Sequence, residues 1–192
     1  RRPRRVGAPW PQYEGMVQHR VAVQVAPAFR GRLKVAWLRD VVRRTLESER
    51  LHTPAEVSLT VTDDATVRTL NARYRGLDEI TDVLSFGLTE ASPDAPGGPF
   101  ALPPSGRIQL GDVVLSYPQA ERQARQAGHT VAHEAAILVA HGVLHLLGYD
   151  HAEPEEKRVM FGKQKAVVAE MASTPPLKSK QSSRLPRIAG KP

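Results

Sequence analysis

Short stretches of alternating hydrophobic and polar residues, separated by longer stretches of helical periodicity, run along most of the chain. Alternation over residues 19–25 and 57–61 predicts two half-buried strands. Between them, apolar residues recur at near-helical spacing over residues 33–46, which predicts an amphipathic helix whose arginines lie on a solvated face. The chain therefore begins as strand, helix and strand.

A second helix and a short strand follow. Asp63 or Asp64 can accept the free amide hydrogens at a helix start, and a short helix is predicted over residues 65–73. The helical stretch that carries Arg75 gives way at Gly76 to a polar loop. The apolar residues after this loop predict a short strand over residues 83–86.

The second half of the chain starts with a long loop and becomes mainly helical. Residues 88–106 are rich in proline and glycine, which is typical of a functional lid or a disordered loop. A strand over residues 108–115 contains Gly111, which indicates a bulge or the close approach of another backbone. Three helices complete the predicted elements, over residues 117–127, 130–147 and 154–171.

This order of elements predicts an α+β (mixed α/β) domain, with a sheet of about four strands packed with about five helices on one or both faces. The helix over residues 130–147 is rich in alanine, isoleucine, leucine and valine, so we expect it to be buried. The candidate chemistry described below lies at the C-terminal end of this buried helix.

The length of 192 residues suits one domain with a sizeable core. The formal net charge of +7 comes from the two ends, because residues 1–20 carry +4 and residues 173–192 carry +5, which leaves −2 for the rest. We expect a basic, disordered N-terminal extension at residues 1–15, one domain over residues 16–172 and a basic, disordered tail at residues 173–192. Met16 is a candidate start of translation.

Composition removes several classes of protein from consideration. No apolar run approaches the roughly 18–20 residues that cross a bilayer, and without cysteine there is no disulfide framework. We therefore expect a cytoplasmic protein that does not bind membranes. Because the body of the chain is nearly neutral, its overall basicity does not by itself indicate a nucleic-acid partner.

Three histidines lie within eleven residues at the end of the buried helix, in the sequence HGVLHLLGYDH. His141 and His145 are four residues apart, so on a helix they share one face, with Cβ atoms roughly 5–6 Å apart. Gly148 fits the left-handed position that ends a helix, and the chain can then turn back and bring His151 to the same ion. This spacing predicts a metal site with His141, His145 and His151 as ligands.

The ligand set predicts catalytic zinc rather than structural zinc. Three neutral imidazoles leave the fourth position of a tetrahedral Zn²⁺ open for water, whereas a structural site more often has four protein ligands with cysteines among them. The same imidazoles accept nickel or copper. Gly142 stands where an HExxH metallopeptidase has its general base, which disfavours a zinc peptidase. His133 would lie about 80° around the helix from His141, so we leave it out of the site.

Two further residues have roles that the pattern leaves open. Arg75 is either a cation favoured at a helix C-terminus or a planar, permanently charged fork for phosphate. Asp150 adjoins the third histidine and is a candidate acceptor that orients a ligand histidine. The general base of a hydrolytic reaction stays unassigned.

The chain resembles the YbeY family, zinc-dependent single-strand endoribonucleases of bacterial ribosomal RNA maturation. Three blocks carry the resemblance: LNARYRGLDEITDVLSF at residues 70–86, LGDVVLS at residues 110–116 and HGVLHLLGYDH at residues 141–151. It spans roughly residues 17–172. Ile80 and Gly87 stand where the family often has proline, which affects the stiffness of the loop more than its chemistry.

The resemblance implies that His141, His145 and His151 hold one zinc ion and that Arg75 faces the same cleft as a catalytic residue. It implies a metal-dependent endoribonuclease for single-stranded ribosomal RNA, active in 16S 3′-end processing and ribosome quality control. The implied partners are the small ribosomal subunit and its assembly factors, and no DNA is expected. The alternative is a ribosome-assembly binding factor with a structural zinc and little nuclease activity.

Overall fold

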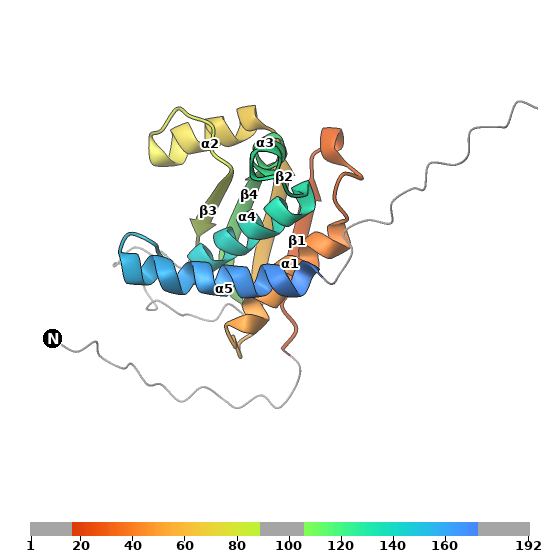
Figure 1. The fold of residues 1–192 in the computed structure, drawn as a ribbon. Coiled ribbons are helices and arrows are strands. Elements are labelled where there is room, and N and C mark those ends of the chain that lie inside the picture. Colours follow the sequence, from red (N-terminus) through yellow and green to blue (C-terminus); the bar gives the residue numbers. More distant parts are fainter. Residues whose placement is uncertain (1–16, 89–105, 173–192) are drawn as a thin grey trace, which may run out of the picture.

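Strands and helices follow one another in the order that the sequence predicts (Figure 1). The computed structural model describes residues 17–88 and 106–172. Its elements are β1 (Arg20–Val25), the 3-10 helix η1 (Pro27–Phe29), α1 (Val35–Ser48), β2 (Ala55–Thr62), α2 (Asp64–Arg75), β3 (Val83–Gly87), β4 (Ile108–Ser116), α3 (Tyr117–Ala127), α4 (Val131–Leu146) and α5 (Pro154–Ala172). Predicted and observed ends agree to within two residues, and η1 is an addition to the predicted elements.

Some of the sequence predictions fall outside the described residues. These are the basic extension at residues 1–15, the tail at residues 173–192 and most of the loop at residues 88–106. Across the described helices, none combines the length and the apolar character needed to cross a membrane.

The four strands that the structure describes form one mixed sheet in the order β1-β2-β4-β3. The strands β1, β2 and β4 are parallel, whereas β3 pairs antiparallel with β4 at the edge of the sheet. An antiparallel edge strand on an otherwise parallel sheet is a common arrangement. This arrangement places β3, which contains the end of the sequence block at residues 70–86, directly beside β4, which contains the block at residues 110–116.

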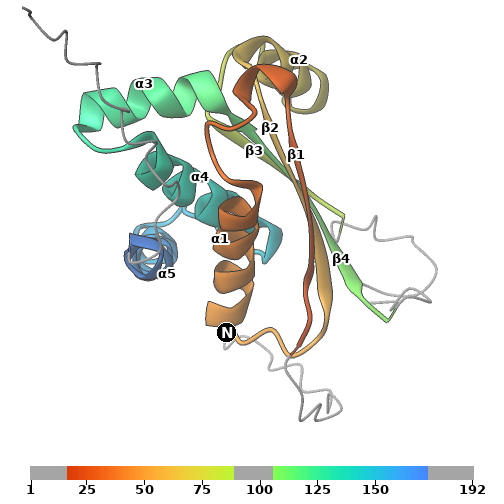
Figure 2. The ribbon, with the colours of Figure 1, turned by 90° about the vertical axis from the view of Figure 1, so that its right-hand side faces the viewer.

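Most of the helices cover one face of this sheet (Figure 2). The helices α1 and α4 pack on the strands, and α5 lies across α1 and α4 on the side away from the sheet. In β2, Ala55, Val57, Leu59 and Val61 are buried toward these helices, whereas the residues between them are half-buried. The predicted α+β class, with about four strands and about five helices, is confirmed.

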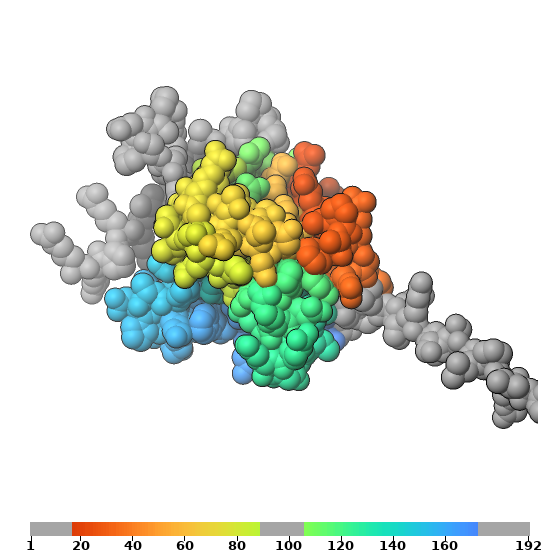
Figure 3. Space-filling view, turned by 90° about the horizontal axis from the view of Figure 1, so that it is seen from above, coloured from red at the N-terminus to blue at the C-terminus, as the bar shows by residue number. Residues whose placement is uncertain are grey.

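The helix α2 packs on the other face, at one end of the sheet. A small apolar cluster of Val67, Leu84 and Val114 joins α2 to β3 and β4. Seen from above, α2 and α3 lie side by side at this end (Figure 3), where Arg122 of α3 forms a salt bridge with Asp64 at 2.9 Å. The N-terminal end of α2 is therefore fixed against both the sheet and a neighbouring helix.

The buried helix α4 approaches the sheet most closely at Gly142. A Cβ atom at this position would lie 2.8 Å from Cγ1 of Val113 and 3.0 Å from Oγ of Ser85. The Ser85 hydroxyl donates a hydrogen bond to the carbonyl oxygen of Gly142 at 3.0 Å. Position 142 thus faces the sheet, and the strand side chains fill the space that the glutamate of an HExxH peptidase would need.

Gly111 allows β3 and β4 to come together at their edge. Its φ is +134°, and a Cβ atom there would overlap the carbonyl oxygen of Phe86. The pairing of β2 with β4 also shifts by one residue between Glu56 and Val57. Both features that the sequence indicated at Gly111, a bulge and a close backbone approach, are present.

Candidate metal centre

The helix α4 ends in a hydrogen-bonded turn that reverses the chain before the third histidine. The amide of Gly148 donates to the carbonyl of His145, and the amide of Tyr149 donates to that of Leu144, which is the Schellman pattern. Gly148 has a φ of +87°, a left-handed conformation that suits glycine. The residues after the turn run back along the helix end and bring His151 beside His145.

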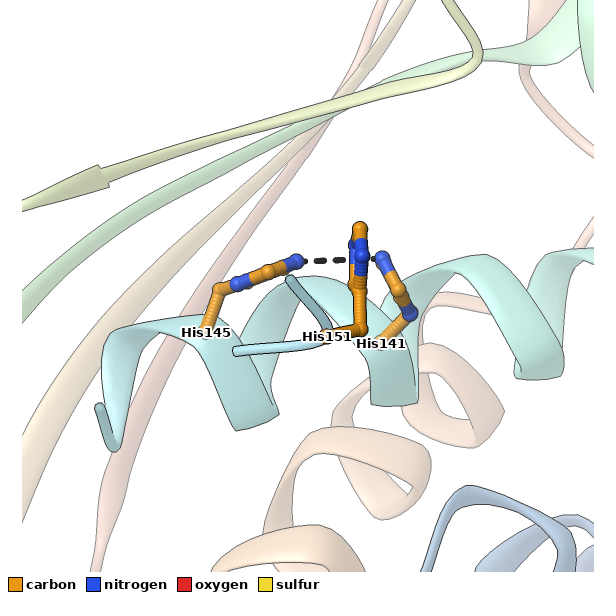
Figure 4. A group of neighbouring side chains, drawn as sticks. All are labelled: His141, His145 and His151. Carbon is orange, nitrogen blue, oxygen red and sulfur yellow. Dashed lines mark hydrogen bonds between the residues drawn. The ribbon is translucent and has the colours of Figure 1, made fainter. Parts of the chain in front are cut away.

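The rings of His141, His145 and His151 point toward one another (Figure 4). One ligand atom from each lies within 4.8 Å of the others. The Nε2 atoms of His141 and His145 are 3.1 Å apart, close to the roughly 3.3 Å that separates two nitrogen ligands of a tetrahedral Zn²⁺. Within residues 17–88 and 106–172, this is the one group of three such side chains that could hold a metal ion.

Gln164 on α5 fixes the orientation of the His141 ring. The Nδ1 atom of His141 lies 3.1 Å from Oε1 of Gln164. A ring that donates its Nδ1–H to this carboxamide oxygen presents an unprotonated Nε2 to the other two histidines. Because a metal ion binds the unprotonated nitrogen, Gln164 selects the tautomer that can act as a ligand.

Burial favours the neutral form of two of these imidazoles. It lowers the pKa of His141, although the hydrogen bond to Gln164 acts in the opposite direction. Burial also lowers the pKa of His145, and the neighbouring His141 and His151 lower it further. Since protons compete with a metal ion for the ring nitrogens, these lowered pKa values would extend the binding of a metal ion toward more acidic pH.

Tyr149 anchors the turn that carries the third histidine. Its hydroxyl donates a hydrogen bond of 2.6 Å to Glu49, which follows α1. Lys163 of α5 donates to the same carboxylate at 2.9 and 3.0 Å, and its Nζ lies 5.2 Å from the centre of the Tyr149 ring. The turn after α4 is therefore tied to both α1 and α5.

A cavity of about 810 Å³ opens beside the histidines. His145 and His151 line it, and so does Arg75 from the end of α2. The Arg75 side chain is exposed and forms no ion pair or hydrogen bond with any other residue in the described part of the chain. Its guanidinium is thus available to an anion that enters the cavity.

Polar contacts hold the connection between α2 and β3 and so position Arg75. The buried Asn71 donates a hydrogen bond from Nδ2 to the carbonyl oxygen of Glu79 at 3.0 Å. Arg68 forms two hydrogen bonds, of 2.7 and 2.8 Å, with the carboxylate of Asp78. Two polar side chains of the first sequence block, Asn71 and Asp78, therefore hold the shape of this loop.

The donor set fits a divalent transition-metal ion. Three imidazole nitrogens suit zinc, nickel or copper, and a carboxamide already orients one of the rings. Asp150 contributes in another way, because its Oδ1 atom accepts a hydrogen bond of 2.7 Å from the amide of His151. Asp150 therefore holds the main chain of the third histidine. The sequence suggested Asp150 as the acceptor that orients a ligand histidine, but the acceptor beside the ring of His141 is Gln164.

Sequence reasoning missed Gln164 and the Tyr149 anchor. Gln164 follows the buried Met160 by four residues and precedes the buried Val168 by four. A polar residue on the core face of a helix was the available signal. His133, which was left out of the site, packs its ring on His129 instead, with centroids 4.8 Å apart.

A family model described as "Endoribonuclease YbeY" matches residues 30–172 of the chain. The chain belongs to the YbeY endoribonuclease family. It is 42% identical to the endoribonuclease YbeY of Dehalococcoides mccartyi strain 195 over 146 residues, which are 75% of this chain and 85% of the relative. Identity to the YbeY protein of Moorella thermoacetica is 46% over 132 residues, covering 69% of this chain and 83% of the relative.

The fold is also similar to a solved structure. The solution structure of TM1509 from Thermotoga maritima is 25% identical in sequence and has a TM-score of 0.54. The match covers 85% of this chain and 99% of TM1509.

Proposed function

We propose that this protein is a zinc-dependent endoribonuclease that cleaves single-stranded RNA. The observation that carries the proposal is that Arg75 lines the same cavity as His145 and His151, two members of the three-histidine cluster. The histidines supply a metal site, and Arg75 supplies a cation for a phosphate beside it. The names of the relatives, which are endoribonucleases, support the same reaction.

Within this proposal each side chain has a definite task. His141, His145 and His151 would hold the ion as neutral imidazoles, with Gln164 keeping the His141 ring in its binding tautomer. When bound, a zinc ion supplies Lewis acidity toward a phosphoryl oxygen and lowers the pKa of water. The guanidinium of Arg75 binds the phosphate with its planar fork and stabilises the negative charge that develops there.

We further propose that the substrate is ribosomal RNA, with processing of the 3′ end of 16S RNA and ribosome quality control as the cellular roles. The small ribosomal subunit and its assembly factors are the proposed partners. Membership of the YbeY family supports these roles. Arg75, which pairs with no other residue in the described part of the chain, lines this cavity and suits an extended, negatively charged chain.

The test is cleavage of a defined single-stranded RNA by metal-replete protein, compared with the His145→Ala variant. Metal content is measured in both samples. The wild type should bind about one zinc ion per chain and cleave, and the variant should lose both properties. The same pair is then compared on a 16S precursor RNA with an extended 3′ end.

Equal residual activity in the two samples would indicate a contaminating nuclease. That result would favour the alternative function, a ribosome-assembly binding factor with a structural zinc. Retention of full metal content and activity by a His141→Ala variant would overturn the assignment of the metal site itself.

A further inference from the structure

An exposed phenylalanine lies next to the three histidines. Phe161 of α5 keeps 40% of its surface exposed, although a ring of this size gains considerably from burial. Its centroid lies 6.2 Å from the ring of His141 and 6.1 Å from that of His151. Phe161 does not line the cavity that contains Arg75. It adds an apolar surface on the α5 side of the histidines.

The position of Phe161 on its helix does not serve the core. The buried residues of α5 are Met160, Val167, Val168 and Met171, and the ring of Phe161 instead contacts the histidine rings and a lysine. Within the described residues, Tyr74 is the other exposed aromatic among the large hydrophobic side chains, and its ring packs edge-on against Phe86. Phe161 therefore lies off the buried face of α5, with part of its ring exposed beside the histidines.

A cation lies over the same ring. The Nζ atom of Lys157, one helical turn earlier, is 5.5 Å from the centre of the Phe161 ring. An aromatic face next to the ammonium group of an exposed lysine matches a nucleotide, which offers a base to stack and a phosphate to pair with the charge. An acidic peptide would use the ammonium but would not need a flat apolar surface.

We propose that Phe161 is a stacking platform for one unpaired base of the RNA, next to the phosphate that is cleaved. This inference rests on the proposed function and adds a base-binding subsite to it. The RNA chain runs from Arg75 across the histidines to α5, where the base covers the Phe161 ring and the Lys157 ammonium turns to the adjacent phosphate. A base inside a duplex cannot reach the ring, so the subsite contributes to a preference for single strands.

The test uses four metal-replete proteins: wild type, Phe161→Leu, Phe161→Tyr and Val159→Ala. Val159 is also exposed on α5, at 36%, but two residues away and about 160° around the helix. Binding to a single-stranded oligoribonucleotide and to its duplex is followed by fluorescence anisotropy, and metal content and cleavage are measured on the same samples.

Phe161→Leu should weaken binding of the single strand by about 5- to 150-fold, the usual effect of losing one base–aromatic stack. Binding of the duplex and metal content should stay the same. Phe161→Tyr should restore the affinity because it keeps an aromatic face, and Val159→Ala should equal the wild type.

If Phe161→Leu binds single-stranded RNA with unchanged affinity, Phe161 is not a stacking platform. Loss of metal, or an equal loss of single-strand and duplex binding, would assign Phe161 a packing role beside the histidines instead. If the wild type binds single strands through Phe161 but does not cleave them, the proposed nuclease function fails while the subsite stands. If the wild type neither binds nor cleaves RNA, both proposals fall.

Discussion

The Nδ1 atom of His141 on α4 lies 3.1 Å from the Oε1 atom of Gln164 on α5. This contact joins two helices at the candidate metal centre and leaves the Nε2 atom of His141 directed at His145, 3.1 Å away. The orientation of this candidate ligand therefore depends on a residue that lies 23 positions further along the chain.

Replacing Gln164 should weaken metal binding without removing a ligand. Gln164→Leu deletes the acceptor for the Nδ1–H of His141, and we expect the zinc affinity to fall by about 10- to 100-fold. Gln164→Glu retains an acceptor oxygen and is the matched control. Competition with a chromophoric chelator gives both affinities, and equal values for Gln164→Leu and wild type would refute an orienting role.

Removing Arg75 should separate metal binding from cleavage. Its side chain lines the cavity and forms no ion pair with another described residue, so Arg75→Ala should leave metal content unchanged. We expect kcat/KM on single-stranded RNA to fall by about 10²- to 10³-fold, the usual effect of losing one group that stabilises transition-state charge. If Arg75→Ala loses both metal and activity, Arg75 has a structural role.

Adding zinc should stabilise the folded protein through the three histidines. A ligand that binds only the native state at 100 times its Kd raises the free energy of unfolding by about 2.7 kcal/mol, which appears as a higher Tm in a thermal melt. His145→Ala should abolish this shift, whereas His133→Ala on the same helix should retain it because His133 lies outside the cluster. A zinc-induced shift that survives in His145→Ala would point to another binding site.

Gly142→Ala should destabilise the fold even though alanine favours helices. The added Cβ would lie 2.8 Å from Cγ1 of the buried Val113, and overpacking of this kind costs about 1–3 kcal/mol, against a gain of up to about 1 kcal/mol in helix propensity. Gly162 of α5 has nothing within 4 Å of its Cβ position, so Gly162→Ala should stabilise. Urea denaturation of both variants measures the difference, and equal effects would contradict close packing at Gly142.

The contribution of Asp64 to stability should depend on pH. The hydrogen bond from Arg122 and one from Ser116 lower the pKa of Asp64 below its usual 3.8. The carboxylate therefore stabilises the fold at pH values above 3.8, and this contribution is lost as the pH falls through the lowered folded-state pKa. Asp64→Asn should lower the free energy of unfolding by about 1 kcal/mol at pH 7, with the difference from wild type shrinking below pH 3.8. A difference that stays constant down to pH 2 would show that ionisation of Asp64 is not its source.

The elements were predictable because their signals are local. Thr130 accepts a hydrogen bond from the amide of His133, and Gly148 adopts the left-handed conformation that ends α4; both follow from residues a few positions apart. The spacing of His141 and His145 places them on one helical face for the same reason. The family resemblance then linked Arg75 to the histidines, a link that no local pattern contains.

The sequence by itself determined the order of strands and helices, the helix ends and the three histidines as a candidate ligand set, since backbone propensity and periodicity act over a few residues. Only the tertiary structure decided that β3 lies antiparallel at the edge beside β4, that Gln164 orients His141, and that Tyr149 is held by Glu49 and Lys163. These contacts join residues that lie far apart along the chain. Which residues meet depends on how the helices pack on the sheet, and sequence periodicity does not encode that packing.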